Sequence, residues 1–254
     1  MPPPDDSLSG AVYDKVISAS APPVSQVTYV LLLVDLVRGE RLWGFSQLVR
    51  GPAALRDVPG LRFCKVLGSG QDGGFGLRPS LSRLGLFCEF DDDANARRFI
   101  GDSVVAAYRQ RSREAFVGRF AAYATRGAWS GHAPAITAGL ARPDSGPIAA
   151  LTRASIRPAA AASFWRHAPP SQDALGTAQG CLLAAGLGEA PVLRQATFSV
   201  WDSQASMDAY ARGGPHLAAI RASYERGYFA ETLFMRFVPL SMHGVYKGRR
   251  HQHG

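Results

Sequence analysis

Short apolar runs alternate with amphipathic stretches along the chain, which is the pattern of a protein that mixes helices and strands. The first run, VTYVLLLVDL, is rich in β-branched and aromatic residues and predicts a buried strand. Predicted strands of the first half cover residues 27–36, 61–68, 84–90 and 116–123. A short helix is predicted from Gly44, and a longer one follows Asp91–Asp93, because acidic residues stabilise a helix N-terminus. The order is strand, helix, strand, turn, strand, acid-capped helix, strand.

The same order of elements returns after a Gly-, Pro- and Ala-rich stretch, residues 127–147. Predicted strands of the second half cover residues 148–156, 180–185, 192–200 and 232–239. Predicted helices cover residues 159–166 and a stretch that begins at Gln204, after the capping pair Asp202-Ser203. At an offset of 236 − 119 = 117 positions the two halves also match in residue type, at Arg119/Arg236, Phe120/Phe237, Gly127/Gly244 and Trp129/Tyr246. The sequence therefore predicts an internal repeat.

A βαββαβ unit forms an antiparallel sheet with two helices on one face, and its bare face must be covered. We predict an α+β fold of tandem duplicated ferredoxin-like units that cover each other, a dimeric α+β-barrel within one chain. Two ferredoxin-like domains that lie side by side without a shared site are the alternative. The predicted divisions are a flexible tail (1–25), a first repeat (26–131), a linker (132–146), a second repeat (147–248) that carries the site, and a disordered basic tail (249–254).

The chain has 254 residues and a net charge of +8, carried almost entirely by arginine. This charge suits anionic membranes, acidic ligands or nucleic acid, although arginine richness also follows from a GC-rich genome. The three cysteines, Cys64, Cys88 and Cys181, have neither disulfide-framework nor zinc spacing, which favours a reducing compartment. The longest apolar run, residues 30–34, is far shorter than the roughly 20 residues of a spanning helix. We expect a cytoplasmic protein that is soluble or peripheral to a membrane.

His216 is the histidine that we expect to carry chemistry. It follows Gly213-Gly214-Pro215, and glycine suits a break and proline the first turn of a new helix. The positive end of the helix dipole favours neutral imidazole, the form that binds a metal. The first repeat has no histidine in the corresponding helix. A partly exposed histidine without a function is the alternative.

The sequence contains no HExxH, CxxC or G-x-S-x-G motif, so a redox reaction would need a cofactor held by few ligands. Haem fits that description, with His216 as its axial ligand. Arg166 and Arg194 are candidates to pair with a haem propionate or to hold bound oxygen, unless they are surface charges. Trp165 and Trp201 are candidates for the wall of the haem pocket, unless they belong to the core.

The second half resembles the spheroidene monooxygenase family, the carotenoid C-2 ketolases of purple photosynthetic bacteria. The resemblance lies in residues 164–175 (FWRHAPPSQDAL), 180–203 (GCLLAAGLGEAPVLRQATFSVWDS) and 207–237 (MDAYARGGPHLAAIRASYERGYFAETLFMRF). It implies a haem b monooxygenase that takes electrons from ferredoxin. O₂ would add two hydroxyl groups in turn at one carbon of an acyclic carotenoid such as spheroidene, and loss of water would leave a ketone. By fold analogy, a helix histidine such as His216 would be the axial ligand of the iron.

A carotenoid substrate lies in the membrane, so the basic residues are expected to hold the protein at an anionic inner (chromatophore) membrane. No nucleic-acid partner is expected. Three alternatives stay open: a cofactor-free monooxygenase, a haem dehydratase, and a carrier of haem or of an apolar ligand.

Overall fold

Strand β1 (Thr28–Leu36) is buried along its whole length, in keeping with the apolar run that predicts it. It pairs antiparallel with β3 (Pro79–Phe90) on one side and with β4 (Ser112–Gly127) on the other. One face of β1 points into the protein interior and the other is covered by helices, so neither face meets solvent. This computed structural model describes residues 26–74, 76–190, 192–212 and 226–254.

The described elements follow the predicted order twice. The first half contains β1, η1 (Arg38–Glu40), α2 (Arg41–Arg50), η2 (Gly51–Leu55), β2 (Leu61–Gly70), η3 (Gln71–Gly73), β3, α3 (Asp93–Ile100), α4 (Ser103–Gln110) and β4. The second half contains β5 (Ile148–Ile156), η4 (Pro158–Ala160), α5 (Ala161–Gly176), β6 (Cys181–Ala190), β7 (Arg194–Trp201), α6 (Gln204–Ala211), β8 (Phe229–Tyr246) and β9 (Arg249–His253).

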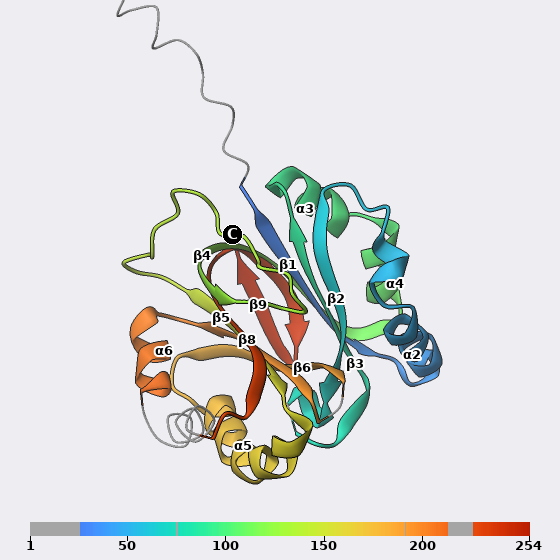
Figure 1. The fold of residues 1–254 in the computed structure, drawn as a ribbon. Helices are drawn as coiled ribbons and strands as arrows, with labels where there is room; N and C mark the ends of the chain where they lie inside the picture. The colour runs from blue at the N-terminus through green and yellow to red at the C-terminus, as the bar shows by residue number, and fades with distance from the viewer. Residues whose placement is uncertain (1–25, 75, 191, 213–225) are drawn as a thin grey trace, which may run out of the picture.

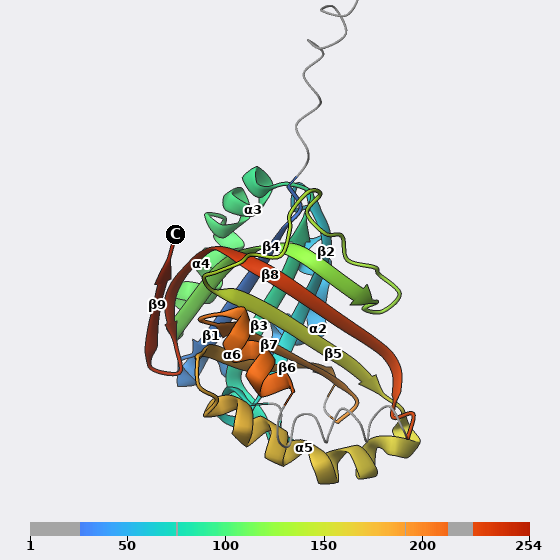
Figure 2. The same cartoon turned by 90° about the vertical axis from the view of Figure 1, so that its left-hand side faces the viewer.

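Eight of the nine described strands close into an antiparallel barrel. Their order is β4-β1-β3-β2-β6-β7-β5-β8, and β8 pairs back to β4. The contact between β2 and β6 is the narrowest, a single register pair Gly68–Gly188 that is supported by a hydrogen bond from Ser69 Oγ to the Gly186 carbonyl (2.6 Å). Helices lie on the outside, with α2, α3 and α4 against the first half and α5 and α6 against the second (Figures 1 and 2). The structure is therefore an α+β barrel in which the halves share one sheet.

The two halves are related by an approximate two-fold axis at the β4–β8 pairing. Phe116 pairs with Gly244 at one end, and Gly127 pairs with Leu233 at the other. Each of these pairs becomes the other at the 117-residue offset that the sequence predicts. Gly127 and Gly244 both have positive φ, and a Cβ atom on either would lie 2.0–2.1 Å from a carbonyl oxygen of the opposite strand. The equivalent positions thus need glycine for the same steric reason.

Three apolar clusters stabilise the barrel. The largest fills the interior with residues of both halves, among them Tyr29, Phe120 and Phe237, and the ring of Phe237 contacts the other two. A second lies between the outer face of the first half and helices α2, α3 and α4. The third lies on the outer face of the second half under α5 and α6, where the described members include Ile148, Trp201 and Met207.

Several predicted boundaries were wrong. The helix expected over 91–112 is two helices, α3 and α4, each capped by an aspartate: Asp92 accepts from Asn95 N and Asp102 from Val104 N. The helix expected to end at Arg166 continues through Pro169 to Gly176, so His167 lies inside α5 and not at its end. Buried side chains at both ends of α5, Trp165 and Leu175, hold it against the sheet and outweigh the prolines.

The basic C-terminal residues form a strand instead of the predicted disordered tail. Strand β9 pairs with β8 from His253–Met242 to Arg249–Tyr246. The turn between them is Lys247-Gly248, and both residues have positive φ (51° and 72°), as a two-residue type I′ hairpin requires. The backbone pairing therefore orders a segment that polar composition alone suggested was mobile.

The first residues after β4 are held in place by contacts with the barrel. Trp129 is fully buried in the barrel interior, where it stacks on Phe87 with 5.6 Å between ring centroids. Its indole N–H donates to the Glu189 carboxylate. Backbone N–H groups of Ser130 and Gly131 donate to the carboxylate of Glu231, each at 3.0 Å. Residues 128–132 therefore cover one end of the barrel.

Candidate functional site

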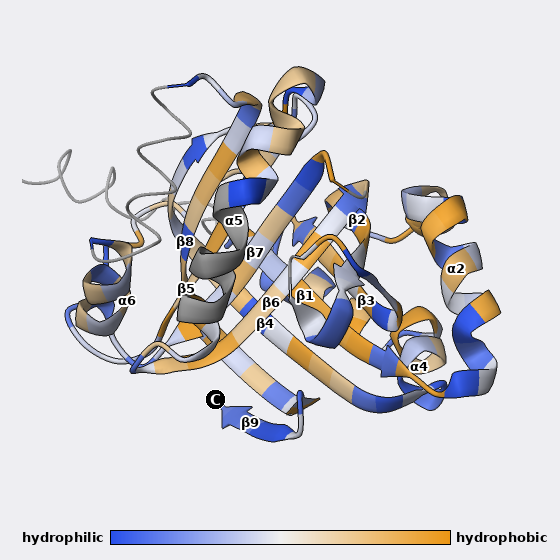
Figure 3. Ribbon diagram, turned by 90° about the horizontal axis from the view of Figure 1, so that it is seen from below, coloured by the Kyte–Doolittle hydropathy of each residue, from blue (hydrophilic) through white to orange (hydrophobic). Residues whose placement is uncertain are grey.

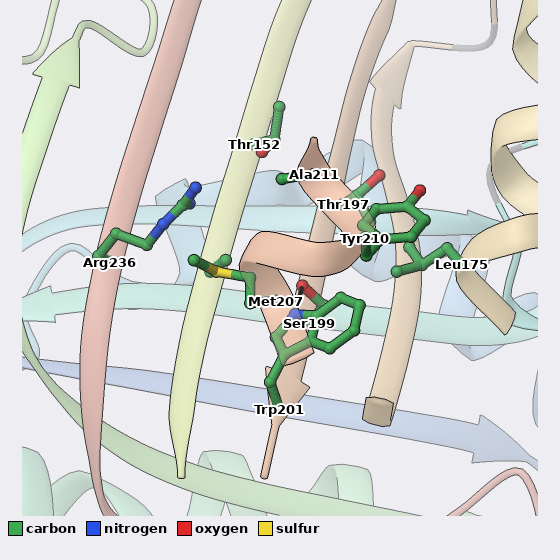
Figure 4. Close-up of a pocket in the computed structure, with 10 residues that line it drawn as sticks. Thr152, Leu175, Thr197, Ser199, Trp201, Met207, Tyr210, Ala211 and Arg236 are labelled. Carbon is green, nitrogen blue, oxygen red and sulfur yellow. Dashed lines mark hydrogen bonds between the residues drawn. The ribbon is translucent and has the colours of Figure 1, made fainter. Parts of the chain in front are cut away.

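A cavity of about 90 Å³ lies on the outer face of the second half, between the sheet and helices α5 and α6 (Figure 4). Its described lining residues come from β5, α5, β7, α6 and β8. They are Ala150, Thr152, Leu175, Thr197, Ser199, Trp201, Met207, Tyr210, Ala211 and Arg236. The wall is thus mainly apolar and aromatic, with three hydroxyl-bearing residues on the strands and one cation.

Strand geometry explains how the sheet contributes to this cavity. Successive side chains of a strand point to opposite faces, so Thr197, Ser199 and Trp201 of β7 all point outward. The indole N–H of Trp201 donates to Ser199 Oγ (3.0 Å), and the Trp201 ring lies 5.4 Å from that of Tyr210. These contacts fix Trp201 as a rigid aromatic floor.

Helix α6 forms the opposite wall. It begins after Ser203, whose hydroxyl accepts from the backbone N–H of Ser206 (3.2 Å), so the predicted cap is confirmed. Met207 is buried in the small outer cluster and points at the sheet. A thioether side chain adapts its shape readily, which suits a wall that must accommodate a ligand.

Arg236 on β8 is the charged group of the cavity (Figure 4). Burial lowers the pKa of its guanidinium from the ordinary value. Its guanidinium donates to the Met235 carbonyl (3.2 Å), and no carboxylate within the described ranges forms an ion pair with it. A half-buried cation without a carboxylate partner favours an anionic group in the cavity.

Arg119, the equivalent of Arg236 in the first half, does form an ion pair. Arg119 forms an ion pair with Asp93 of α3 and donates to Ser241 Oγ (3.0 Å). At the 111-residue offset that relates Phe90-Asp91 to Trp201-Asp202, position 93 corresponds to position 204, which is Gln204. The position equivalent to the carboxylate partner of Arg119 is therefore a neutral amide in the second half, a difference that the sequence shows at the 111-residue offset.

A second cavity of about 40 Å³ adjoins the first, and Leu175 and Thr197 line both. Lys247 lies at its other side, where its Nζ donates to the Ala184 carbonyl (3.0 Å). Burial lowers the pKa of this ammonium group. The space under α5 therefore extends away from Arg236 toward a second cation.

The structure brings one of the residues predicted from the sequence to this cavity. Trp201 lines it, whereas Trp165 is buried nearby and donates to the Val192 carbonyl (2.8 Å). Arg166 is exposed. Arg194 is 54% exposed and lies 3.7 Å from Glu189. His216 lies outside the described residues, as does the helix predicted to begin at Pro215.

A polar cluster at the barrel end is the other concentration of titratable groups. Glu89 is fully buried, and one of its oxygens lies 2.8 Å from His132 Nε2. Arg153, also buried, pairs with Glu231, which holds the 130–131 backbone. Among the described residues no three His, Cys, Asp or Glu side chains are grouped so as to hold a metal ion. These contacts anchor the segment after β4.

Comparison with known proteins gives consistent relatives. The chain is 53% identical over 238 residues to a spheroidene monooxygenase of Rubrivivax gelatinosus, covering 92% of this chain and 91% of the relative. It is 36% identical over 210 residues to the enzyme of that name from Rhodobacter capsulatus, covering 82% and 87%. No family model matches the chain.

Solved structures show the fold alone. An aldoxime dehydratase superposes with a TM-score of 0.53 at 12% identity, covering 88% of this chain and 82% of that one. A second aldoxime dehydratase, in complex with butyraldoxime, gives a TM-score of 0.56 at 12% identity, covering 89% and 82%. The barrel is therefore a known architecture. Within the described residues no helix is long and apolar enough to cross a membrane.

Proposed function

The chain belongs to the spheroidene monooxygenase family and is a monooxygenase, and from this premise we propose that it introduces a keto group at C-2 of acyclic carotenoids such as spheroidene. The observation that carries the proposal is 53% identity across nearly the whole length of both chains. A match over 92% of this chain extends over both halves of the barrel.

The proposed reaction consists of two hydroxylations at one carbon. In each, one oxygen atom of O₂ replaces a C–H bond by C–OH, while two electrons and two protons reduce the other atom to water. The resulting geminal diol loses water and leaves the ketone. The proposed electron donor is a ferredoxin, and a net charge of +8 favours encounter with an acidic protein.

Haem b is the proposed cofactor, and the cavity matches it in chemistry but not in size. Trp201, Met207 and Leu175 supply apolar contacts, and Arg236, which forms no ion pair among the described residues, suits a carboxylate such as a propionate. A cavity of about 90 Å³ equals the volume of roughly three water molecules, so a macrocycle requires α5 and α6 to move outward. The described residues around the cavity include no histidine, and we propose His216 as the axial ligand. Bound haem would activate O₂.

The residues of the cavity have roles that do not depend on the cofactor. Trp201 and Met207 exclude water from the cavity, and Arg236 supplies a positive charge to it. Thr197 and Ser199 offer hydroxyl groups for hydrogen bonds to a hydroxylated product. We also propose that the halves are tandem copies of a ferredoxin-like βαββαβ unit, of which the second kept the site.

An absorption spectrum and a product assay test the proposal. Purified protein should show a Soret band, and spheroidene with reduced ferredoxin and ¹⁸O₂ should yield a C-2 ketone that carries the label. Turnover by protein that has no Soret band would refute haem as the cofactor and would support a cofactor-free monooxygenase. Absence of any ketone with an intact haem spectrum would refute the proposed substrate position.

Two variants distinguish the proposed axial ligand of the haem iron from a residue of the cavity wall. His216→Ala should abolish the Soret band or shift it. Arg236→Met should retain the fold and weaken haem retention, whereas Arg153→Met, also a buried arginine but outside the cavity, should leave haem retention unchanged. An unchanged spectrum in His216→Ala would eliminate His216 as the ligand.

A further inference from the structure

The outer face of α2 carries an apolar stripe that no described part of the chain covers. Leu42, Phe45 and Val49 are 85%, 65% and 71% exposed. At about 100° per residue these positions fall within an arc of about 60° on one side of the helix. In Figure 3 α2 lies at the outer edge of the molecule and carries hydrophobic positions next to hydrophilic ones. We define these three residues as the α2 stripe.

The opposite face of α2 is firmly packed, so the stripe has a fixed orientation. A Cβ atom on Gly44 would lie 2.3 Å from Leu36 Cδ1, which shows how closely the helix approaches β1. Trp43 packs edge-on against Tyr108 (4.9 Å) and under the Arg111 guanidinium (4.8 Å). Turning the stripe inward would break these contacts. The exposure of the stripe is therefore a property of the folded protein.

Arginines flank the stripe on both sides. Arg41 and Arg50 lie on either side of the apolar arc, and Arg38 and Arg56 lie just before and after the helix. All four are exposed, and none forms an ion pair within the described part of the chain. The nearby acid Glu40 is instead paired with Arg111 (3.3 Å). The face thus combines exposed apolar side chains with uncompensated positive charge.

We propose that α2 docks the enzyme on an anionic lipid surface, with the α2 stripe in the acyl-chain boundary and Arg41 and Arg50 at the headgroups. This combination of an apolar face and cationic flanks is what interfacial helices use. A protein partner or a second copy would need a complementary acidic, apolar face, and the arginines of this chain would repel each other in a symmetric contact. A bilayer requires no such match. The proposal does not depend on the proposed carotenoid reaction.

Vesicle sedimentation of the full chain tests the proposal. Wild-type protein should bind vesicles of phosphatidylcholine with 30% phosphatidylglycerol, and bind pure phosphatidylcholine much less. Leu42→Ser/Phe45→Ser/Val49→Ser should reduce binding more than tenfold. Arg41→Gln/Arg50→Gln should reduce it about 25-fold, since each arginine near an anionic surface contributes roughly a factor of five. The assay contains no carotenoid, so its failure is distinct from failure of the proposed function.

Matched controls keep the test specific. Leu77→Ser/Leu81→Ser/Ile136→Ser removes exposed apolar side chains elsewhere, and Arg98→Gln/Arg109→Gln removes the same charge from α3 and α4. Both should bind like wild type, and thermal melting should show that all four variants fold. Equal loss in control and test variants would refute a role for α2. A wild-type dimer in sedimentation velocity that the stripe variant dissociates would instead identify a second copy as the occupant, and would also refute the proposal.

Discussion

Replacing Trp129 tests how the barrel depends on the segment that follows β4. The side chain is fully buried among residues of both halves, stacks on Phe87 at 5.6 Å and lies 5.8 Å from the Phe63 ring. A buried tryptophan removes about 150–250 Å² from water, worth roughly 4–6 kcal/mol at 25 cal/mol per Å². Measured Trp→Ala changes in cores cost about 3–5 kcal/mol. We expect Trp129→Ala to lower the free energy of unfolding by about 4 kcal/mol.

Trp129→Phe separates packing from hydrogen bonding. Phenylalanine keeps most of the stacking area but loses the N–H that donates to Glu189. That carboxylate keeps an ion pair with Lys65 (3.0 Å), so the loss is limited to about 1.5–3 kcal/mol. The order of stability should be wild type, Trp129→Phe, Trp129→Ala.

Urea unfolding followed by circular dichroism measures these differences. For a domain of this size the Trp129→Ala change corresponds to a fall in Tm of roughly 10 °C. Phe45→Ala, at an exposed position, is the control and should change stability by less than about 0.5 kcal/mol. A loss below about 1 kcal/mol in Trp129→Ala would show that the segment after β4 is not part of the barrel core.

Three further predictions concern local features. Burial alone would raise the pKa of Asp93, but hydrogen bonds and charge from Arg97 and Arg119 lower this pKa below the ordinary value. The resulting contribution to stability is complete above the unfolded-state pKa near 4 and is lost as the pH falls through the folded-state pKa. Asp93→Asn should therefore flatten the fall in Tm between about pH 5 and 3. Cys64 and Cys88 are buried register partners with sulfurs 3.0 Å apart, and burial raises the pKa of Cys88. Thiol titration should therefore detect less than one reactive cysteine per chain in the native protein and three in the denatured protein. Gly244→Ala should lower Tm by several degrees, because φ is 118° and a Cβ would lie 2.1 Å from a carbonyl oxygen; an unchanged Tm would contradict the close approach of β4 and β8.

The order of elements could be predicted because each depends on local signals. The apolar run of β1, the cap at Ser203 and the offset that relates Gly127 to Gly244 are all legible along the chain. The closure of the barrel follows from burial, since two sheets with one bare face each must cover one another. Strand β9 was missed because its order comes from pairing with β8, which composition does not report.

The site was harder to predict because the role of each residue depends on which side chains of distant segments lie next to it in the fold. Arg166 and Arg194 were chosen for their neighbours in sequence, yet both are exposed. Arg236 is visible in the sequence only as a match to Arg119, and its importance lies in the absence of an ion pair with any described carboxylate. The proximity of Cys64 and Cys88 is likewise a matter of strand register across 24 residues.

The approximate symmetry explains why the cavity lies in the second half. In the first half the register pairs Val30–Cys88 and Leu32–Leu86 face α3 and α4 and are packed in the outer cluster. The equivalent pairs of the second half are Ala150–Ser199 and Thr152–Thr197, and all four line the cavity. Smaller and more polar side chains at these positions leave space that their counterparts fill. The cavity is thus built by substitution on a common scaffold.

The role of the cavity can be tested by giving these positions of the second half larger side chains, like those of the first half. Ala150→Val/Thr152→Leu should fill the cavity, keep or raise stability by up to about 2 kcal/mol, and abolish ketone formation. Ala154→Val, farther along β5 and outside the cavity lining, is the control and should retain activity. Stability comes from thermal melting and activity from the carotenoid assay. A filled variant that melts like wild type and remains fully active would place the reaction elsewhere in the barrel. Loss of activity with unchanged or raised stability is the expected result, because a cavity kept open at a cost to packing is the mark of a site.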